Sequence, residues 1–326
     1  MARSADPTSL SPNMLGEQAR RASFPTRPAA DVVDARSRRT RRWSVARRWR
    51  RRLDPAAVVG VSLTVAFVLA ALLAPLIMPH DPLSQDVARR LKPPGFTDAQ
   101  TGVYVLGTDG LGRDILSRLL EGARVSLLVG VCGALLSALL GTTIGLTAGY
   151  FGRWWDTSVM RAVDVWQAIP FTVLAIEVVV ILGPNLQNVI LVLGITSWVN
   201  YARVVRAETL AQRNGELVVA ARVVGASHLR ILLHHVLPQV TASIIVLTSL
   251  LVASMILFEA SLSFLGLGVQ PPVPSWGNMV LDGVEPIRTA WWVSFFPGLA
   301  ILLAVMGINL LGDWLRDVLD PRQRTS

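Results

Sequence analysis

Long apolar runs separated by short polar segments make up most of the chain after residue 55. A helix that crosses the hydrocarbon core of a bilayer needs about 20 predominantly apolar residues. The third such run is short, and we expect its helix to begin nearer Val159, with Arg161 and Asp164 at the membrane interface. The pattern predicts an all-α membrane protein with six transmembrane helices, at roughly 56–78, 125–149, 168–183, 186–205, 239–266 and 291–312.

The positions of the Lys and Arg residues indicate which side of the membrane each loop faces. Of these 31 residues, 24 lie in four segments, namely 1–52, 151–161, 203–235 and 313–326. Cytoplasmic loops carry an excess of positive charge, so we predict that both termini are cytoplasmic. The expected organisation is a disordered Arg-rich cytoplasmic tail (1–52), a first transmembrane helix with an external segment (53–124), a five-helix core (125–315) with a cytoplasmic loop (203–237), and a carboxyl-terminal tail (316–326).

The amino-acid composition is that of a membrane protein and argues against a nucleic-acid partner. Of the 326 residues, 52% are hydrophobic and 16% are charged, which is less charge than soluble domains carry. The net charge of +9 resides in the tail, where residues 1–52 hold 14 arginines and 4 acidic residues. A basic tail on a nearly neutral apolar body indicates a cytoplasmic anchor and no nucleic-acid partner. The run from Arg36 to Arg52 either contacts anionic membrane lipid or only sets the topology, and we favour the second.

Several kinds of chemistry are excluded by missing residues. Lys92 is the only lysine and follows Leu91, so the chain has no Gly-Lys pair and no P-loop. If ATP drives this protein, ATP and Mg are bound by another subunit, and this chain binds no cofactor itself. Cys132 is the only cysteine, so no intrachain disulfide can form. His234 and His235 point apart on a helix and lack a third ligand, so we predict no metal site.

The segment from Glu216 to Gln239 separates two apolar runs and has the features of a docking surface. Strong helix formers from Glu216 to Val224 predict a short helix. Gly225 can adopt backbone conformations closed to other residues and would turn the chain there. Ser227 is a suitable N-cap for a second helix, and Pro238 suits the first turn of the next membrane helix. Spacing alone leaves a second interpretation open, an amphipathic connector on the membrane surface.

This segment resembles the Glu-Ala-Ala loop by which permeases of ABC importers contact their ATPase subunits. Ala220, Ala221, Gly225, Leu237 and Pro238 match the family pattern in register. Val219 stands where the family has its glutamate, and His235 replaces a hydrophobic position. The resemblance implies an ATPase-coupling site formed by Glu216, Val219, Ala220, Ala221, Arg222, Gly225, Ala226, Ser227, Leu237 and Pro238. The polar contact of the missing glutamate would then come from Glu216 or Arg222.

Two further signatures resemble the peptide and nickel group of these permeases. The first is LGTDGLGRD at 106–114, followed by GARVSL at 122–127, and the second is SFLGLGVQPP at 263–272, followed by PSWG at 274–277. A closing segment at 309–322 fits the same group. Within it, the chain is similar to the "C" permease of dipeptide and oligopeptide systems, and the resemblance covers roughly residues 53–322.

For the charged residues outside the docking segment, the sequence leaves two alternative roles open. Asp109, Arg113 and Asp114 either contact a substrate-delivery protein or form a local salt-bridged cap, and we favour the cap. Glu177 and Glu259 lie within apolar spans, where an ionised side chain is expected to face protein or water rather than lipid. Each is a candidate for the transport pathway or for a buried structural contact.

The resemblance implies a permease subunit of a type I ABC importer in the bacterial cytoplasmic membrane. A second homologous permease, two ATPase subunits and an extracytoplasmic solute-binding protein would complete it, and peptides would cross by alternating access. The chain itself would catalyse no reaction. Nickel chelates or other small solutes are the alternative substrates. An ion-coupled secondary transporter using Glu177 and Glu259 is a rival, but no internal repeat is evident. A membrane scaffold would leave the glycine and proline signatures unexplained.

Overall fold

The computed structural model describes residues 55–319. Five helical stretches in this part of the chain are long and apolar enough to cross a membrane. Four of them are single helices, namely α3 (Pro55–Ile77), α4 (Ile115–Phe151), α7 (Leu186–Gln212) and α12 (Trp292–Leu319). The fifth runs from His228 to Phe264 and comprises α9 (His228–Ile231), η2 (Leu232–Val236) and α10 (Leu237–Phe264). The expected tail at 1–52 lies outside the described residues, as does 320–326, whereas 316–319 continue α12 rather than forming a tail.

The third predicted span is not one straight helix. It is replaced by α5 (Arg153–Ala168) and α6 (Phe171–Leu182), which are bent by 83° and count as a sixth span only if taken together. The break lies at Ile169, whose backbone is extended, and at Pro170. Proline disfavours the helical conformation of the residue before it and has no N–H to donate. The backbone therefore leaves the helix inside an apolar run.

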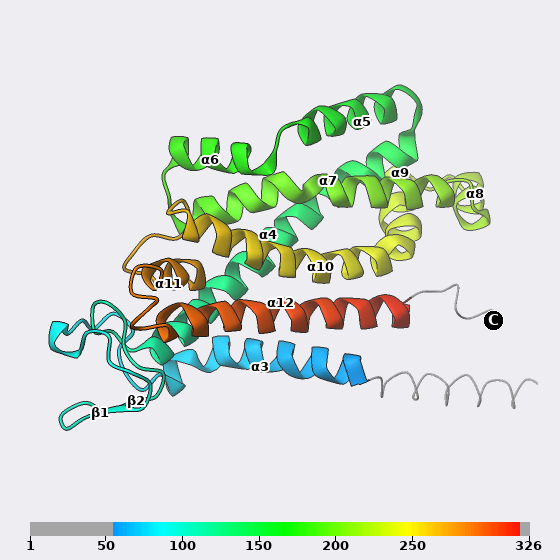
Figure 1. Ribbon diagram of the computed structural model, residues 1–326. Coiled ribbons are helices and arrows are strands. Elements are labelled where there is room, and N and C mark those ends of the chain that lie inside the picture. The colour runs from blue at the N-terminus through cyan, green and yellow to red at the C-terminus, as the bar shows by residue number, and fades with distance from the viewer. Residues whose placement is uncertain (1–54, 320–326) are drawn as a thin grey trace, which may run out of the picture. The chain divides into compact units, whose positions relative to one another are not determined.

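The external segment predicted between the first two spans is not wholly helical. It holds the short helix η1 (Val87–Arg89) and an antiparallel hairpin of β1 (Phe96–Asp98) and β2 (Gly102–Tyr104). Together with α11 (Trp276–Asp282), this segment lies at one end of the bundle (Figure 1). The start of α3, the end of α12 and the helix α8 (Glu216–Val223) lie at the other end. The expectation of an all-α protein is corrected only by this hairpin.

A buried charge cluster closes the bundle at the hairpin end. Asp109 is 1% exposed, accepts a hydrogen bond of 2.7 Å from Nε of Arg113 and pairs with Arg118. Both arginines also contact Asp282 of α11, at 3.2 and 3.3 Å. Asp114 caps the start of α4 by accepting from the backbone N–H of Ser117. The structure thus forms the local salt-bridged cap that the sequence favoured.

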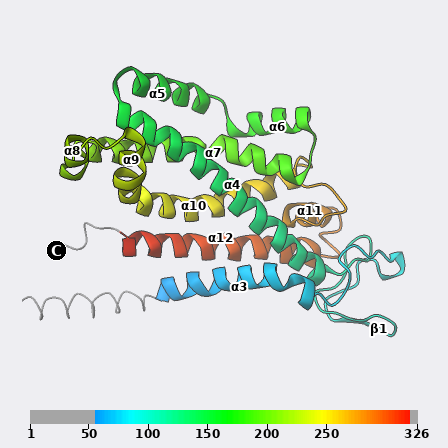
Figure 2. The same ribbon diagram turned by 180° about the vertical axis from the view of Figure 1, so that it is seen from behind.

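The most extensive helix contact is that of α4 with α7, which cross as Figure 2 shows from behind. Gly141, Gly145 and Gly149 of α4 face α7 at intervals of one helical turn. A Cβ atom on Gly145 would lie 2.7 Å from the carbonyl oxygen of Ala202 and 3.0 Å from Cβ of Val205. Small residues at such positions let two membrane helices approach closely and gain dispersion contacts. The two helices pack against each other because these side chains are missing.

Gly145→Ala tests this contact, because the added methyl group meets the backbone of α7. We expect G145A to lower the free energy of unfolding in detergent by about 1–3 kcal/mol, the usual cost of overpacking. Gly298→Ala in α12 is the matched control, since a Cβ there meets no atom within 4 Å. Equal thermal denaturation of the two variants would show that the glycines do not set the α4–α7 distance.

Candidate functional site

Helix α8 is anchored to the bundle along one side. Val218 is 1% exposed and belongs to a hydrophobic cluster with Val205, Ile231 and Val236. Ala221 and Ala226 pack against the same cluster. These contacts join α8 to α7 and to the helical stretch that leads into α10, so the short helix is held by burial of its inner face.

The turn after α8 has the geometry expected from Gly225. Its φ of +82° lies in the left-handed region that favours glycine. The N–H of Ala226 donates to the carbonyl oxygen of Ala221 at 3.0 Å, and the N–H of Gly225 donates to that of Arg222, a common way to end a helix. Ser227 then caps α9 by accepting from the N–H of Arg230. The predicted helix, hinge and N-cap are confirmed.

The outer face of α8 is apolar and has no partner in the described part of the chain. Val223 and Val224 are 82% and 86% exposed. Leu217 and Val219 are exposed beside them. Val219, which replaces the family's glutamate, therefore lies on this face rather than in the core. Contiguous exposed apolar side chains mark surfaces that contact a protein partner or a membrane, and α8 carries such a surface.

Polar groups around α8 hold it to α4. The guanidinium of Arg222 lies over the ring of Tyr150 at 5.3 Å and donates to the carbonyl oxygen of Arg213 at 3.3 Å. The hydroxyl of Tyr150 is 2.9 Å from Nδ1 of His228. Arg222 thus has contacts within the chain, whereas Glu216 is exposed in the first turn of α8. No local pattern in the sequence indicates Tyr150 and His228, because residues 78 positions apart meet here only through the fold.

Pro238 lies in the first turn of α10, as the sequence predicts, although α10 continues the preceding helical turns without a break. The helix runs from His228 through the π turn η2 into α10, with the N–H of Leu237 donating to the carbonyl oxygen of Leu232. A π turn widens the helix locally and so makes room for the proline ring, which clashes with the preceding turn of an α-helix. The side chain of Gln239 donates to the carbonyl oxygen of His235 at 2.7 Å.

The two intramembrane glutamates have different surroundings. Glu259 is fully buried and accepts a hydrogen bond of 2.7 Å from the hydroxyl of Ser263, and Ser126 of α4 lies 3.5 Å from its other oxygen. The hydroxyl of Ser263 also accepts from the N–H of Val269. This is the environment of a structural contact that fastens the loop after α10. Glu177 is exposed on α6, and its side chain forms no hydrogen bond with any residue from 55 to 319.

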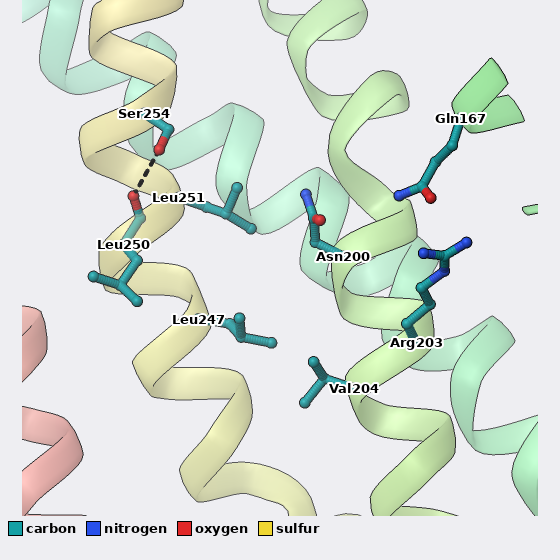
Figure 3. Close-up of a pocket in the computed structure, with 8 residues that line it drawn as sticks. All are labelled: Gln167, Asn200, Arg203, Val204, Leu247, Leu250, Leu251 and Ser254. Atoms are coloured by element: carbon teal, nitrogen blue, oxygen red, sulfur yellow. Dashed lines mark hydrogen bonds between the residues drawn. The ribbon is translucent and has the colours of Figure 1, made fainter. Parts of the chain in front are cut away.

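A cavity of about 440 Å³ lies between α5, α7 and α10 (Figure 3). Its lining residues are Gln167, Asn200, Arg203, Val204, Leu247, Leu250, Leu251 and Ser254. Arg203 donates through Nη2 to Asp164 at 2.7 Å. No group of three His, Cys, Asp or Glu side chains within residues 55–319 could hold a metal ion.

These features are those of a multi-span helical membrane protein whose short helix α8 carries an apolar surface at one end of the bundle. The chain belongs to the family of binding-protein-dependent transport system inner membrane components, whose model matches residues 141–325. A second model, for the N-terminal transmembrane domain of oligopeptide transport permease C, matches residues 42–94. Membership makes it a multi-pass inner-membrane component of a transport system, with a role in transport and not in catalysis.

Curated relatives agree with this assignment, and a solved structure shares the fold. The di/tripeptide transport permease DppC of Pseudomonas aeruginosa is 43% identical over 84% of this chain and 90% of its own length. The glutathione transport permease GsiD of Pectobacterium atrosepticum is 41% identical, over 85% and 91% of the two chains. The inward-facing methionine ABC transporter MetNI shares the fold, with a TM-score of 0.52 over 62% of this chain and 96% of its own, at 18% identity.

Val218→Ala tests the anchoring of α8. The change removes two methyl groups from a fully packed position, so we expect the free energy of unfolding to fall by roughly 2 kcal/mol and amide exchange in α8 to accelerate. Val223→Ala removes the same atoms from the exposed face and should alter neither quantity. Similar amide exchange rates in V218A and V223A would contradict the anchoring role.

Proposed function

We propose that the chain is one of two permease subunits of an ATP-driven importer that moves short peptides into the cytoplasm. The observation that carries this proposal is the exposed apolar face of the anchored helix α8, which lies within the segment that matches the ATPase-contacting loop of the family. Two ATPase subunits would bind ATP and Mg and dock on α8. A second homologous permease and an extracytoplasmic solute-binding protein complete the system.

The proposed topology has six spans and both termini in the cytoplasm. The bent pair of α5 and α6 serves as the third span. The start of α3, the end of α12 and α8 lie at one end of the bundle (Figure 1), which is what a cytoplasmic α8 and cytoplasmic termini require. The distribution of the arginines supports the same orientation. The hairpin and the buried charge cluster would then lie on the external side.

The proposed mechanism is alternating access driven from α8. When ATP closes the ATPase subunits, they displace α8. Val218 and its hydrophobic cluster pass the displacement to α7 and α10, and the contacts of Tyr150 pass it to α4. Packed helices of this kind move as rigid bodies between inward-open and outward-open arrangements. Glu259 would hold α4 to α10 during this movement, and Glu177 would face the second permease or water.

The coupling site we propose contains Glu216, Val219, Ala220, Ala221, Arg222, Gly225, Ala226, Ser227, Leu237 and Pro238, with separate roles. Val219 and its exposed neighbours contact the ATPase by burial of apolar surface. Glu216 and Arg222 are both exposed, but the Glu216 side chain forms no hydrogen bond or ion pair with residues 55–319, whereas Arg222 lies over Tyr150, so we assign the polar contact to Glu216. The substrate class follows the relatives, whose names specify dipeptides, tripeptides and glutathione. No observation favours nickel chelates or ion coupling.

Val223→Asp tests the docking surface, because a charge at the centre of an apolar contact must be desolvated without a partner. We expect V223D to insert in the membrane normally and to lose copurification with the ATPase subunits. Val103→Asp changes an exposed valine of β2 at the other end of the bundle and is the matched control. Copurification of V223D at the wild-type level would rule out docking on this face.

Gly225→Val tests the turn. A Cβ there has free space, so the substitution acts only through backbone strain at a positive φ, of order 1–3 kcal/mol. We expect G225V to retain ATPase binding but to lose most ATP-dependent peptide uptake in proteoliposomes. Gly225→Asn is the graded control, since asparagine tolerates the left-handed region better. The proposal requires uptake to fall in the order wild type, G225N, G225V.

A further inference from the structure

The cavity between α5, α7 and α10 carries three polar side chains on one wall. Gln167 lies at the end of α5, and Asn200 and Arg203 lie one helical turn apart on α7 (Figure 3). Leu247 and Leu251 extend from α10 on the opposite wall. The cavity thus joins hydrogen-bonding groups on one side to an apolar surface on the other.

Most of the hydrogen-bonding capacity of this wall is unused. The side-chain amides of Gln167 and Asn200 form no hydrogen bond with any other residue between 55 and 319. Arg203 makes one, from Nη2 to Asp164 at 2.7 Å. A guanidinium has five N–H donors, so the pairing with Asp164 leaves further donors free. Two amides and part of a guanidinium are therefore open to the cavity.

The depth of Asn200 in the bundle decides what its amide faces. Asn200 lies near the middle of the 27-residue helix α7, and Leu250 and Leu251 lie near the middle of α10. At such depth lipid offers no hydrogen-bond partner, and unpaired polar groups are costly there. Polar side chains within membrane spans accordingly face a water-filled cavity or a protein partner. This wall belongs to a water-filled path or to a contact with another molecule.

We propose that this cavity binds the main chain and terminal carboxylate of a short peptide as it crosses the membrane. Arg203 holds the carboxylate by charge-assisted hydrogen bonds while it stays paired to Asp164. The amides of Gln167 and Asn200 each offer donor and acceptor groups that match a peptide unit. Leu247 and Leu251 contact the peptide side chains without selecting among them. The inference rests on the proposed import of peptides and adds the residues that contact the peptide.

Thiol accessibility tests whether the cavity is open to water and peptide. Cys132, the only cysteine, is first replaced by serine, and Asn200→Cys or Leu72→Cys is added in the assembled importer in proteoliposomes. We expect a charged, membrane-impermeant thiol reagent to modify N200C, and turnover of trialanine to slow that modification. L72C, exposed on α3 across the bundle from α5, should not react. An unreactive N200C, or one that trialanine does not protect, would overturn the proposal.

Uptake separates a role in peptide contact from a role in the ion pair. We expect Arg203→Gln to lower the maximal rate of trialanine uptake about tenfold or more, the usual value of a charged hydrogen bond. Asp164→Asn removes the ion pair but keeps Arg203 and a side-chain oxygen that can accept its hydrogen bond, so we expect a much smaller loss than in R203Q. Equal losses in R203Q and D164N would assign Arg203 a structural role and overturn the proposal. If the wild-type importer takes up no peptide in the presence of ATP and its binding protein, the proposed function itself fails.

Discussion

The close approach of α4 to α7 is the contact on which the rest of the bundle depends. It requires the three glycines that replace side chains with direct backbone packing. Helix α4 has 37 residues and is about 55 Å long at 1.5 Å per residue, more than the hydrocarbon core of a bilayer. Its first turn therefore belongs to the buried charge cluster at one end, and Tyr150 in its last turn contacts Arg222 and His228 at the other. One helix connects the two ends of the molecule.

Features that depend on neighbouring residues, such as spans, turns and caps, could be predicted from the sequence. Features that depend on contacts between distant helices could not. Apolar runs located α3 to within a residue, and Gly225 and Ser227 predicted the turn and the N-cap correctly. Hydropathy is insensitive to a backbone break, so the bend at Ile169 and Pro170 was missed. Nothing local distinguishes Val218 from Val219 either, because distant helices decide which of the two valines is buried.

Some polar side chains of the membrane-spanning helices have hydrogen-bond partners within the described part of the chain, and others have none there. Glu259 is a candidate from the sequence because it is acidic and lies within an apolar run. In the structure, however, its carboxylate accepts a hydrogen bond from a serine hydroxyl, and its burial keeps solutes from reaching it. Gln167 and Asn200 are uncharged, so their residue types did not suggest a site, although their amides are open to a cavity. The number of filled hydrogen bonds, which only a structure reveals, separates a structural group from one that can bind a solute.

The π turn η2 also sets how α8 and α9 are rotated about the axis of α10. An α-helix advances by 3.6 residues per turn, so the extra residue of a π turn shifts the phase of everything before it by about 100° relative to α10. The direction in which α8 and α9 point around the axis of α10 is therefore set by one residue between Leu232 and Val236. A chain shorter by that residue would keep every span and every apolar side chain, yet would direct its exposed valines toward a different neighbour.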